Sequence, residues 1–544
     1  MTKYYIILIL LAFLLNSCMK KTEVDLIVIN AKVYTVDSNF MIAEAFAVKN
    51  GVFEATGSTD SILRYYKSEK IIDLEGKTVY PGFIDAHSHF YGYGLFTQRI
   101  DLNGLKSFEE VLQKVAVHAK NNTEGWITGR GWDQNLWKNN EYPDNTELDK
   151  LFPDRPVMLT RVDGHAVLVN EAAIRQSGID LNKYSEFVIK KNGRFTGILL
   201  DNAADIIKEA AANPDENYIK QCYKIAEQAC FSVGLTSVCD AGLKVKFIKI
   251  IDNMHKTGEL KMRVYAMFDP DEETIDFIKK NGTIINEKLS ARAVKLYADG
   301  ALGSHGACLL DFYDDEKSKK GSILYPMDFY QMYCQFAYEN NMQVCVHAIG
   351  DSANRMVLNL FKQYLEPEND RRWRIEHAQV VHPDDLKYFK AYSIIPSVQF
   401  VHATSDMEWA GKRLGNERLK TAYAYKTLLE QNCWIPYGTD FPVENINPIY
   451  GFFAAVFRKN IDGKPENGFL PENAITRQQA LQAMTIWAAK ANFEEKIKGS
   501  IEKGKLADFV VLDKDILTVA ENEVPLTKIL QTFLSGEMVF MNKN

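Results

Sequence analysis

Four histidines stand where buried strands are expected to end, and this placement indicates a metal site. His87 and His89 close the apolar stretch VYPGFIDAHSH, with one serine between them. Side chains two apart on a strand point the same way, so both imidazoles can reach one point, as a metal requires. His347 ends QVCVHAIG and His377 ends RWRIEHAQ. Either alone fits a hydrogen-bonded core histidine better, but four of the ten histidines share this placement, which favours metal binding.

Two further residues could complete such a site, and each has a second interpretation. Lys295 lies inside the apolar run AVKLYADG, where an unpaired ammonium is costly to bury. It fits either an ion pair with Asp299 or a carbamate, an anion that could bridge two metals. Asp440 ends WIPYGTD. It fits either a metal ligand that shuttles protons or the N-cap of a following helix. The residues themselves leave both choices open.

The elements that must position these side chains alternate between strand-like and helix-like segments. Eight apolar runs end in polar residues, and helix-like stretches such as 217–233 and 327–340 lie between them. Eight such units predict a TIM (β/α)8 barrel, an α/β fold whose chemistry sits at the carboxyl ends of the strands. The predicted strands are 79–87, 234–242, 262–268, 292–300, 343–350, 372–379, 393–399 and 432–440.

The ends of the chain differ from the middle. Residues 24–80 and 499–544 read as short β-branched and aromatic strands broken by Asn, Asp and Gly, and they predict one β-sandwich domain built from both termini. The barrel domain is then 81–498. The first two barrel strands are separated by a long interval, about 91–216, which a compact barrel does not need. We therefore expect an inserted subdomain there, over the mouth of the active site.

Composition narrows the class of partner. The 544 residues carry a net charge of −7 and are 46% hydrophobic, which fits a globular protein and offers no basic excess for a nucleic acid. Apart from Cys18, the seven cysteines form no CxxC pair and no even set, so neither a disulfide framework nor a thiolate zinc site is predicted. A small-molecule substrate is the expected partner, and the sequence also allows a homodimer.

The first residues have the layout of an export signal. Lys3 precedes the apolar run 4–15, which is too short to span a bilayer, and then comes LNSC. This ending resembles a bacterial lipobox, which implies a signal peptide over residues 1–18, cleavage before Cys18 and a lipid on its thiol. A plain cleaved signal is the alternative. With Met19 after the cysteine, we expect a lipoprotein of the bacterial cell envelope, in the outer membrane and facing the periplasm. Membrane association is expected through this anchor only.

Taken together, the motifs resemble a known family. PGFIDAHSHF, a mid-chain lysine, VHAIGD, IEHAQ and GTDFPV occur in the order of the amidohydrolase superfamily. RGWDQ, KLYADGALGSHGA and GSIEKGKLADFVVLD look like its YtcJ-like branch, which includes the N-substituted formamide deformylases. The resemblance covers nearly the whole chain after the signal. It implies one or two divalent metals, usually zinc, in a barrel that carries a terminal β-sandwich.

The resemblance also implies roles for individual residues. His87 and His89 would bind the more buried metal, His347 and His377 the second, and a carboxylated Lys295 would bridge them. Asp440 would contact the buried metal and take the proton of the attacking water. Four positions are expected on the substrate side: Trp132, His165, Asp299 and His305.

Two of those substrate positions carry a qualification. Trp132 could simply pack the core of the insertion, and His305 stands where the branch usually has an arginine.

The predicted activity is hydrolysis of a C–N bond, of the amide or formamide type, in a small organic molecule. An ester or cyclic-amide hydrolase on the same barrel is one alternative. A non-catalytic, lipid-anchored binding protein is the other.

Overall fold

Seven parallel strands form most of a barrel in the computed structural model, which describes residues 21–122, 124–161, 164, 166–211 and 215–543. The strands follow chain order around the sheet, and each is hydrogen bonded to the next. All seven are apolar runs that are buried almost throughout, as strands enclosed by helices must be. They are β10 (Phe83–Ser88), β17 (Leu235–Leu243), β18 (Arg263–Phe268), β20 (Leu289–Tyr297), β21 (Gln343–Ala348), β22 (Arg374–His377) and β23 (Ile395–Ser397).

The eighth position of the barrel is taken by an irregular segment, 436–440. On one side, Gly438 N donates to Val398 O at 3.1 Å, next to β23. On the other side, Ala86 N donates to Tyr437 O at 3.0 Å and Asp440 N donates to His87 O at 2.8 Å, on β10. The segment therefore joins the last strand to the first and nearly closes the ring. The expectation of a TIM barrel is confirmed, with its eighth strand reduced to bridging hydrogen bonds.

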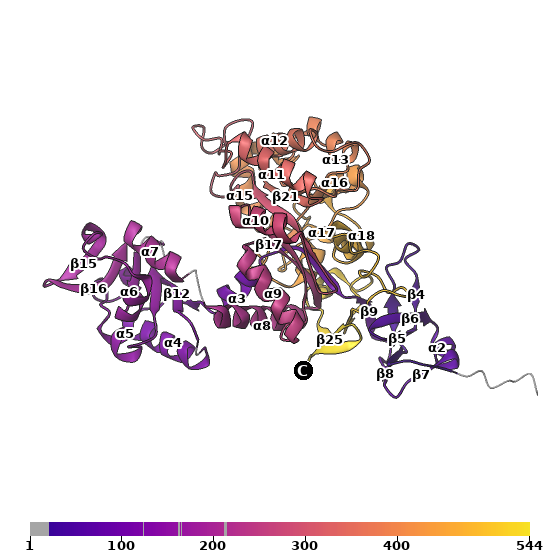
Figure 1. Ribbon diagram of the computed structural model, residues 1–544. Coiled ribbons are helices and arrows are strands. Elements are labelled where there is room, and N and C mark those ends of the chain that lie inside the picture. The colour runs from indigo at the N-terminus through magenta and orange to yellow at the C-terminus, as the bar shows by residue number, and fades with distance from the viewer. Residues whose placement is uncertain (1–20, 123, 162–163, 165, 212–214, 544) are drawn as a thin grey trace, which may run out of the picture. The chain divides into compact units, whose positions relative to one another are not determined.

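Helices cover the outside of the strands, as parallel connections require (Figure 1). Each turns an apolar stripe inward; α9, for example, buries Ile248, Ile251 and Met254. In the part of the chain that the structure describes, no helix has the length and apolar character needed to cross a membrane. The principal helices are α9 (Val245–Thr257), α10 (Glu272–Asn281), α11 (Met327–Glu339), α12 (Asp351–Phe361), α14 (Phe400–Ser405), α15 (Met407–Leu419), α16 (Tyr425–Asn432), α17 (Pro448–Phe457), α18 (Arg477–Ala483) and α19 (Ile486–Ala491).

Both ends of the chain contribute to a β-sandwich. One sheet has the order β26-β25-β24-β9-β3-β4, so C-terminal strands pair directly with N-terminal ones, and the other has the order β6-β5-β2-β8. Phe46, Phe53, Phe509 and Phe533 meet in the shared core. The strands are β2 (Leu26–Ile29), β3 (Lys32–Tyr34), β4 (Ile42–Ala43), β5 (Ala45–Lys49), β6 (Val52–Gly57), β8 (Ile71–Asp73), β9 (Thr78–Pro81), β24 (Phe509–Leu512), β25 (Ile529–Leu534) and β26 (Glu537–Met541).

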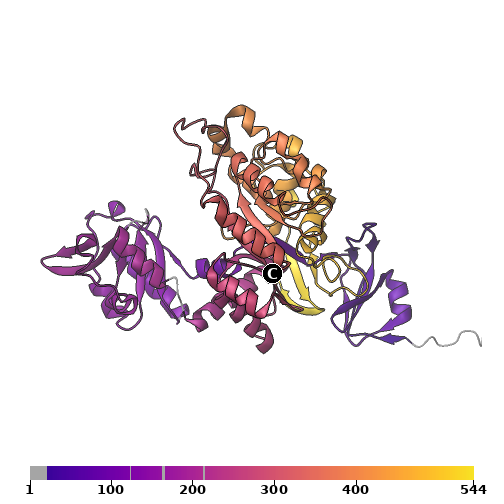
Figure 2. The same cartoon turned by 45° about the horizontal axis from the view of Figure 1, so that its top comes forward.

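The inserted segment forms a second compact unit, residues 90–226. Its sheet has the order β11-β12-β13-β14-β16-β15, with helices on both faces (Figure 2). Two apolar cores lie on opposite faces: Ile127 and Leu159 belong to one, Met158 and Val167 to the other. The elements are β11 (Ile100–Asp101), β12 (Ile127–Trp132), β13 (Val157–Arg161), β14 (Ala166–Val169), β15 (Val188–Lys191), β16 (Arg194–Leu200), α3 (Phe90–Thr97), α4 (Phe108–Asn121), α5 (Thr146–Leu151), α6 (Glu171–Ser177) and α7 (Asp201–Ala211).

Candidate metal centre

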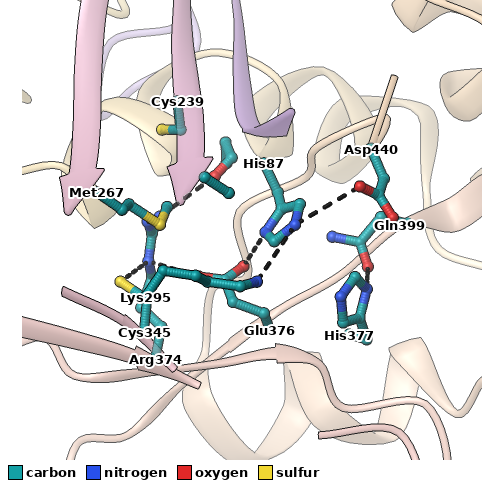
Figure 3. Close-up of polar contacts among 12 residues, drawn as sticks. His87, Cys239, Met267, Lys295, Cys345, Arg374, Glu376, His377, Gln399 and Asp440 are labelled. Atoms are coloured by element: carbon teal, nitrogen blue, oxygen red, sulfur yellow. Dashed lines mark hydrogen bonds and ion pairs between the residues drawn. The ribbon is translucent and has the colours of Figure 1, made fainter. Parts of the chain in front are cut away.

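Three of the four predicted histidines have one ring nitrogen fixed by a hydrogen-bond acceptor. His87 Nδ1 lies 2.7 Å from Glu376 Oε2, and His377 Nδ1 lies 2.7 Å from Gln399 Oε1 (Figure 3). His89 Nδ1 lies 3.1 Å from the carbonyl oxygen of Ala241. An acceptor at Nδ1 places the proton there and leaves Nε2 with a free lone pair. Each imidazole is thereby prepared to bind a cation through Nε2.

These lone pairs converge on the carboxylate of Asp440. Asp440 Oδ1 lies 3.1 Å from His89 Nε2 and 3.6 Å from His87 Nε2. Ligand atoms of His87, His377 and Asp440 all lie within 4.8 Å of one another. Asp440 Oδ1 is buried and accepts no hydrogen bond from the described residues. An unsatisfied carboxylate oxygen among imidazole lone pairs is unfavourable without a cation, so the donor set fits a divalent metal.

The backbone at the strand ends is held in an uncommon conformation. Asp440 has φ +64° and His377 has φ +75°, both in the left-handed region. Asp85 fixes the Asp440 turn, because its carboxylate accepts from Thr439 Oγ1 at 2.7 Å and from the backbone N–H groups of Thr439 and His87, each at 3.1 Å. Burial raises the pKa of Asp85 to about 7 against these hydrogen bonds. Such strain commonly marks functional positions.

The Glu376 carboxylate that orients His87 is itself part of a buried ion pair. Arg374 Nε lies 3.0 Å from Glu376 Oε1, and both side chains are fully buried (Figure 3). Burial alone would raise the pKa of Glu376, but Arg374 and His87 hold it well below its usual value. Glu376 is therefore a carboxylate, and it makes His87 a stronger donor toward a metal.

Lys295 extends from β20 into the same cluster. Its side chain is 1% exposed, and its Nζ lies 3.5 Å from His87 Nε2. Burial lowers its pKa, although Glu376 and Asp440 act in the opposite sense. No carboxylate of the described residues forms an ion pair with it. The Asp299 carboxylate instead accepts from the backbone N–H groups of Ile349, Gly350 and Cys308, at 3.0, 2.8 and 2.8 Å. The ion-pair interpretation of Lys295 is thus not the arrangement found.

His347 lies beside His377, with their ring centroids 4.5 Å apart. Its Nε2 is buried without a hydrogen bond and lies 3.6 Å from Asp299 Oδ1. Burial, helped by Lys295, lowers the pKa of His347 to about 3, so the ring is neutral. A neutral, unsatisfied imidazole is a competent metal ligand. Asp299 is 2% exposed; its carboxylate faces this histidine and accepts hydrogen bonds from the loop that follows it.

The cluster lies in a cavity of about 360 Å3, a size that suits a small molecule. All six predicted metal-site residues line it: His87, His89, Lys295, His347, His377 and Asp440. Leu302, Trp409 and Val443 contribute an apolar wall, and Asp406 and Glu444 contribute carboxylates. Asp406 accepts from Tyr423 Oη at 2.8 Å and Gln379 Nε2 at 3.1 Å, which fixes its position.

Of the four residues predicted on the substrate side, Trp132, Asp299 and His305 lie within the described part of the chain. Trp132 is 1% exposed in the core of the inserted unit, where its Nε1 donates to Leu159 O at 2.7 Å and its ring stacks on Trp137. This is the packing role that the sequence left open. His305 does not line the cavity; its Nε2 lies 3.1 Å from Asp315 Oδ1. His165 and Cys18 lie outside the described residues.

Sequence reasoning missed several residues of this site. His402, on α14 after the seventh strand, lines the cavity and has its Nε2 3.7 Å from Asp440 Oδ2. Glu376 and Gln399 orient two of the histidines. The only available signals were a carboxylate inside the apolar run WRIEHA and a fifth histidine just beyond a predicted strand. Neither pattern is specific without the contacts across strands.

Proteins of similar sequence support the barrel fold and the candidate metal centre. A family model described as "Amidohydrolase family" matches residues 70–540. The putative amidohydrolase YtcJ of Bacillus subtilis is 31% identical over 520 residues, 93% of this chain and 98% of its own. The N-substituted formamide deformylase of Arthrobacter pascens is 26% identical over 542 residues, 94% of this chain and 97% of its own.

A solved structure is similar to this chain as well. An uncharacterized metal-dependent hydrolase from Pyrococcus furiosus is 29% identical and superposes with a TM-score of 0.77, covering 91% of this chain and 100% of that one. The chain therefore belongs to the amidohydrolase family, whose members are metal-dependent hydrolases. The family and fold expected from the motifs are confirmed.

Proposed function

We propose that this protein hydrolyses a C–N bond of the amide or formamide type in a small organic molecule. One or two divalent metals would serve the reaction, with zinc as the usual choice for such a donor set. The observation that carries the proposal is the convergence of His87, His377 and Asp440 ligand atoms within 4.8 Å of one another, in a cavity of small-molecule size. The name of the Arthrobacter pascens relative supports the choice of bond.

Six residues would hold the metal. Ligand atoms of His87, His377 and Asp440 already lie within 4.8 Å of one another. His89, Lys295 and His347 line the same cavity. A divalent cation held there acidifies water and polarises a carbonyl group. The unsatisfied Asp440 Oδ1 and His347 Nε2 fit this assignment, because both are buried atoms without a hydrogen bond.

Asp440 is the group best placed to move a proton. Burial would raise its pKa, but His89, whose Nε2 lies 3.1 Å from Oδ1, and the neighbouring His87 and His377 hold the pKa well below the usual value. It is thus a carboxylate at neutral pH and can accept a proton from water. Its second oxygen faces His402 Nε2 at 3.7 Å. The carboxylate can then release that proton to a leaving nitrogen, which departs as a neutral amine.

A substrate screen tests the bond type. Metal-loaded protein lacking residues 1–18 would be assayed against matched N-formyl amines, N-acyl amines, esters and lactams. We expect the formyl or acyl amines to have the highest kcat/KM, and Asp440→Asn to reduce it at least 100-fold. Higher kcat/KM on esters or lactams would refute the C–N acyclic assignment. Activity that Asp440→Asn leaves intact would refute the role of the carboxylate.

A further inference from the structure

A second pocket, of about 320 Å3, lies within the inserted unit. Strands β12 and β13 form its floor. They pair in parallel with Thr128 opposite Met158 and Arg130 opposite Thr160. Because side chains alternate along a strand, these four residues share one face of the sheet. All four line the pocket.

The lining of this pocket is basic. Arg99, Arg130 and Lys208 line it, and none of its described lining residues is an acid. Lys208 has partners, since its Nζ donates to Asp205 Oδ1 at 2.8 Å and to the carbonyl oxygen of Gly164 at 2.9 Å. Neither arginine forms an ion pair within the described part of the chain. Two uncompensated guanidinium groups in one concave site give it a positive potential.

A buried hydroxyl in the floor has no hydrogen-bond partner. Thr128 is 5% exposed, and its Oγ1 forms no hydrogen bond with any described residue. Thr196, buried in the same unit to 7% exposure, does have a partner, because its Oγ1 donates to Ile189 O at 2.8 Å. Leaving a buried hydroxyl without a hydrogen bond is unfavourable, so Thr128 is available to donate to a ligand.

We propose that this pocket binds a small oxyanion, either a carboxylate or a phosphate group. The planar guanidinium of Arg130 offers paired donors that match the oxygens of such a group, and Arg99 adds a second charge. The hydroxyl of Thr128 donates to a remaining oxygen. The apolar side chains of Leu95 and Met158 also line the pocket, and they suit an organic group that carries the anion.

Anion binding to the protein lacking residues 1–18 provides the test. Inorganic phosphate and succinate would be titrated by calorimetry at low ionic strength, with chloride as the only other anion. We expect saturable binding of at least one probe, which added salt weakens. Arg99→Gln/Arg130→Gln should weaken it at least tenfold, and Thr128→Val should weaken it several-fold while retaining both charges. Which probe binds more tightly decides between phosphate and carboxylate.

A matched variant controls for charge alone. Arg194→Gln removes an exposed guanidinium of the same unit that lies outside the pocket, and it should leave binding unchanged. Thermal melting of each variant would establish that it is folded. Absence of binding by the unchanged protein would overturn the proposal, as would equal affinity in the double variant. The latter result would place the anion elsewhere, including at the metal centre, which the double substitution leaves intact.

Discussion

Three histidines of the site, His87, His377 and His89, are each oriented by an acceptor from a different element. Glu376 belongs to β22, Gln399 follows β23, and the Ala241 carbonyl lies on β17. All three acceptors engage Nδ1, which leaves three Nε2 atoms facing the cavity. Arrangements of this kind fix both the tautomer and the ring orientation before a metal arrives. At the scale of the residue, the site is therefore preorganised for a cation.

This orientation predicts the effect of removing ligands. Replacing His87 and His89 together with Ala should remove most bound metal, because the Nε2 atoms beside Asp440 are lost. Elemental analysis of the purified protein lacking residues 1–18 measures the metal per chain. His382→Ala, at a half-buried loop residue outside the site, should bind metal as before. Full metal content in the double variant would show that the site is assigned wrongly.

Lys295 gives a second prediction at this scale. A neutral amine can attack carbon dioxide, forming an N–C bond and releasing one proton, and the carbamate has two oxygens able to bridge metals. Burial, the lack of an ion pair and the 3.5 Å approach to His87 Nε2 favour this form. Lys295→Ala should lose activity and one metal per chain, and bicarbonate or short carboxylic acids should restore part of both.

Two observations would contradict the carbamate. The first is unchanged metal stoichiometry in Lys295→Ala. The second is unmodified amine density at Lys295 in a crystal structure with full metal occupancy. His382→Ala again serves as the variant that should change neither quantity.

At the scale of the element, a buried ion pair ties the barrel to the terminal sandwich. Arg263, at the start of β18, has its Nε 2.8 Å from Asp508 Oδ2, just before β24. Arg263 also donates to Ser535 Oγ at 2.6 Å and to the carbonyl oxygen of Glu287 at 3.1 Å. The side chains are 1% and 4% exposed, so solvent cannot replace either partner.

Breaking this pair should be costly. Asp508→Asn removes the buried anion of this guanidinium and leaves only the largely exposed Glu287 carboxylate, 3.5 Å away, so we expect a loss of about 3–5 kcal/mol in the free energy of unfolding. Chemical denaturation followed by circular dichroism measures it. Asp276→Asn, on an exposed face of α10, should change stability by less than about 0.5 kcal/mol. Equal stability of the two variants would mean that the ion pair does not support the domain junction.

Helix α9 contains a histidine that should make the fold sensitive to acid. His255 Nε2 donates to Met262 O at 2.9 Å, and burial lowers the pKa of this histidine to about 4 from the usual 6.5. The unfolded chain therefore binds a proton at a higher pH than the folded chain does. The stability due to the neutral ring is present above pH 6.5 and is lost as the pH falls toward 4, by up to about 3 kcal/mol.

His255→Gln isolates this contribution, because Gln keeps a donor but does not titrate. The stability of the unchanged protein relative to this variant should fall between pH 7.5 and pH 4.5, as measured by denaturation at each pH. Asn253→Gln, an exposed substitution on the same helix in which neither residue titrates, should show no such trend. A pH-independent difference for His255→Gln would contradict the assignment.

The elements were predictable to different degrees. Seven barrel strands lie within apolar runs whose ends are marked by polar residues, so the sequence pattern alone locates them. The eighth, 436–440, forms no regular ladder, and its place is known only from hydrogen bonds to β10 and β23. Site residues such as His87 were predictable from their spacing. Glu376, Gln399 and His402 were not, because their contacts join residues far apart in the chain.

At the scale of the whole molecule, the chain is a barrel with a terminal β-sandwich and an inserted α/β unit. One sheet of the sandwich pairs C-terminal strands with N-terminal ones, and both ends contribute to the shared core, so truncation of either end should expose that core. The first paired strand, β1 (Thr22–Glu23), lies four residues after Cys18 and pairs with β7 (Tyr66–Lys67). Four extended residues reach about 14 Å at most. A lipid on Cys18 would thus hold the sandwich close to a bilayer.

Lipidation of Cys18 is the prediction that belongs to this scale, and a lipid there would also determine where the protein works. In a bacterial host, the full-length protein should incorporate a labelled fatty acid and sediment with the membrane fraction. Each bound acyl chain contributes about 0.8 kcal/mol per buried CH2, so several chains would retain the whole body. Cys18→Ala should abolish the label and release the protein, whereas Cys433→Ala, at an exposed thiol of the barrel domain, should change neither. A label that persists in Cys18→Ala would rule out the anchor, and separation of inner from outer membranes would then test the expected outer-membrane location of the wild-type protein.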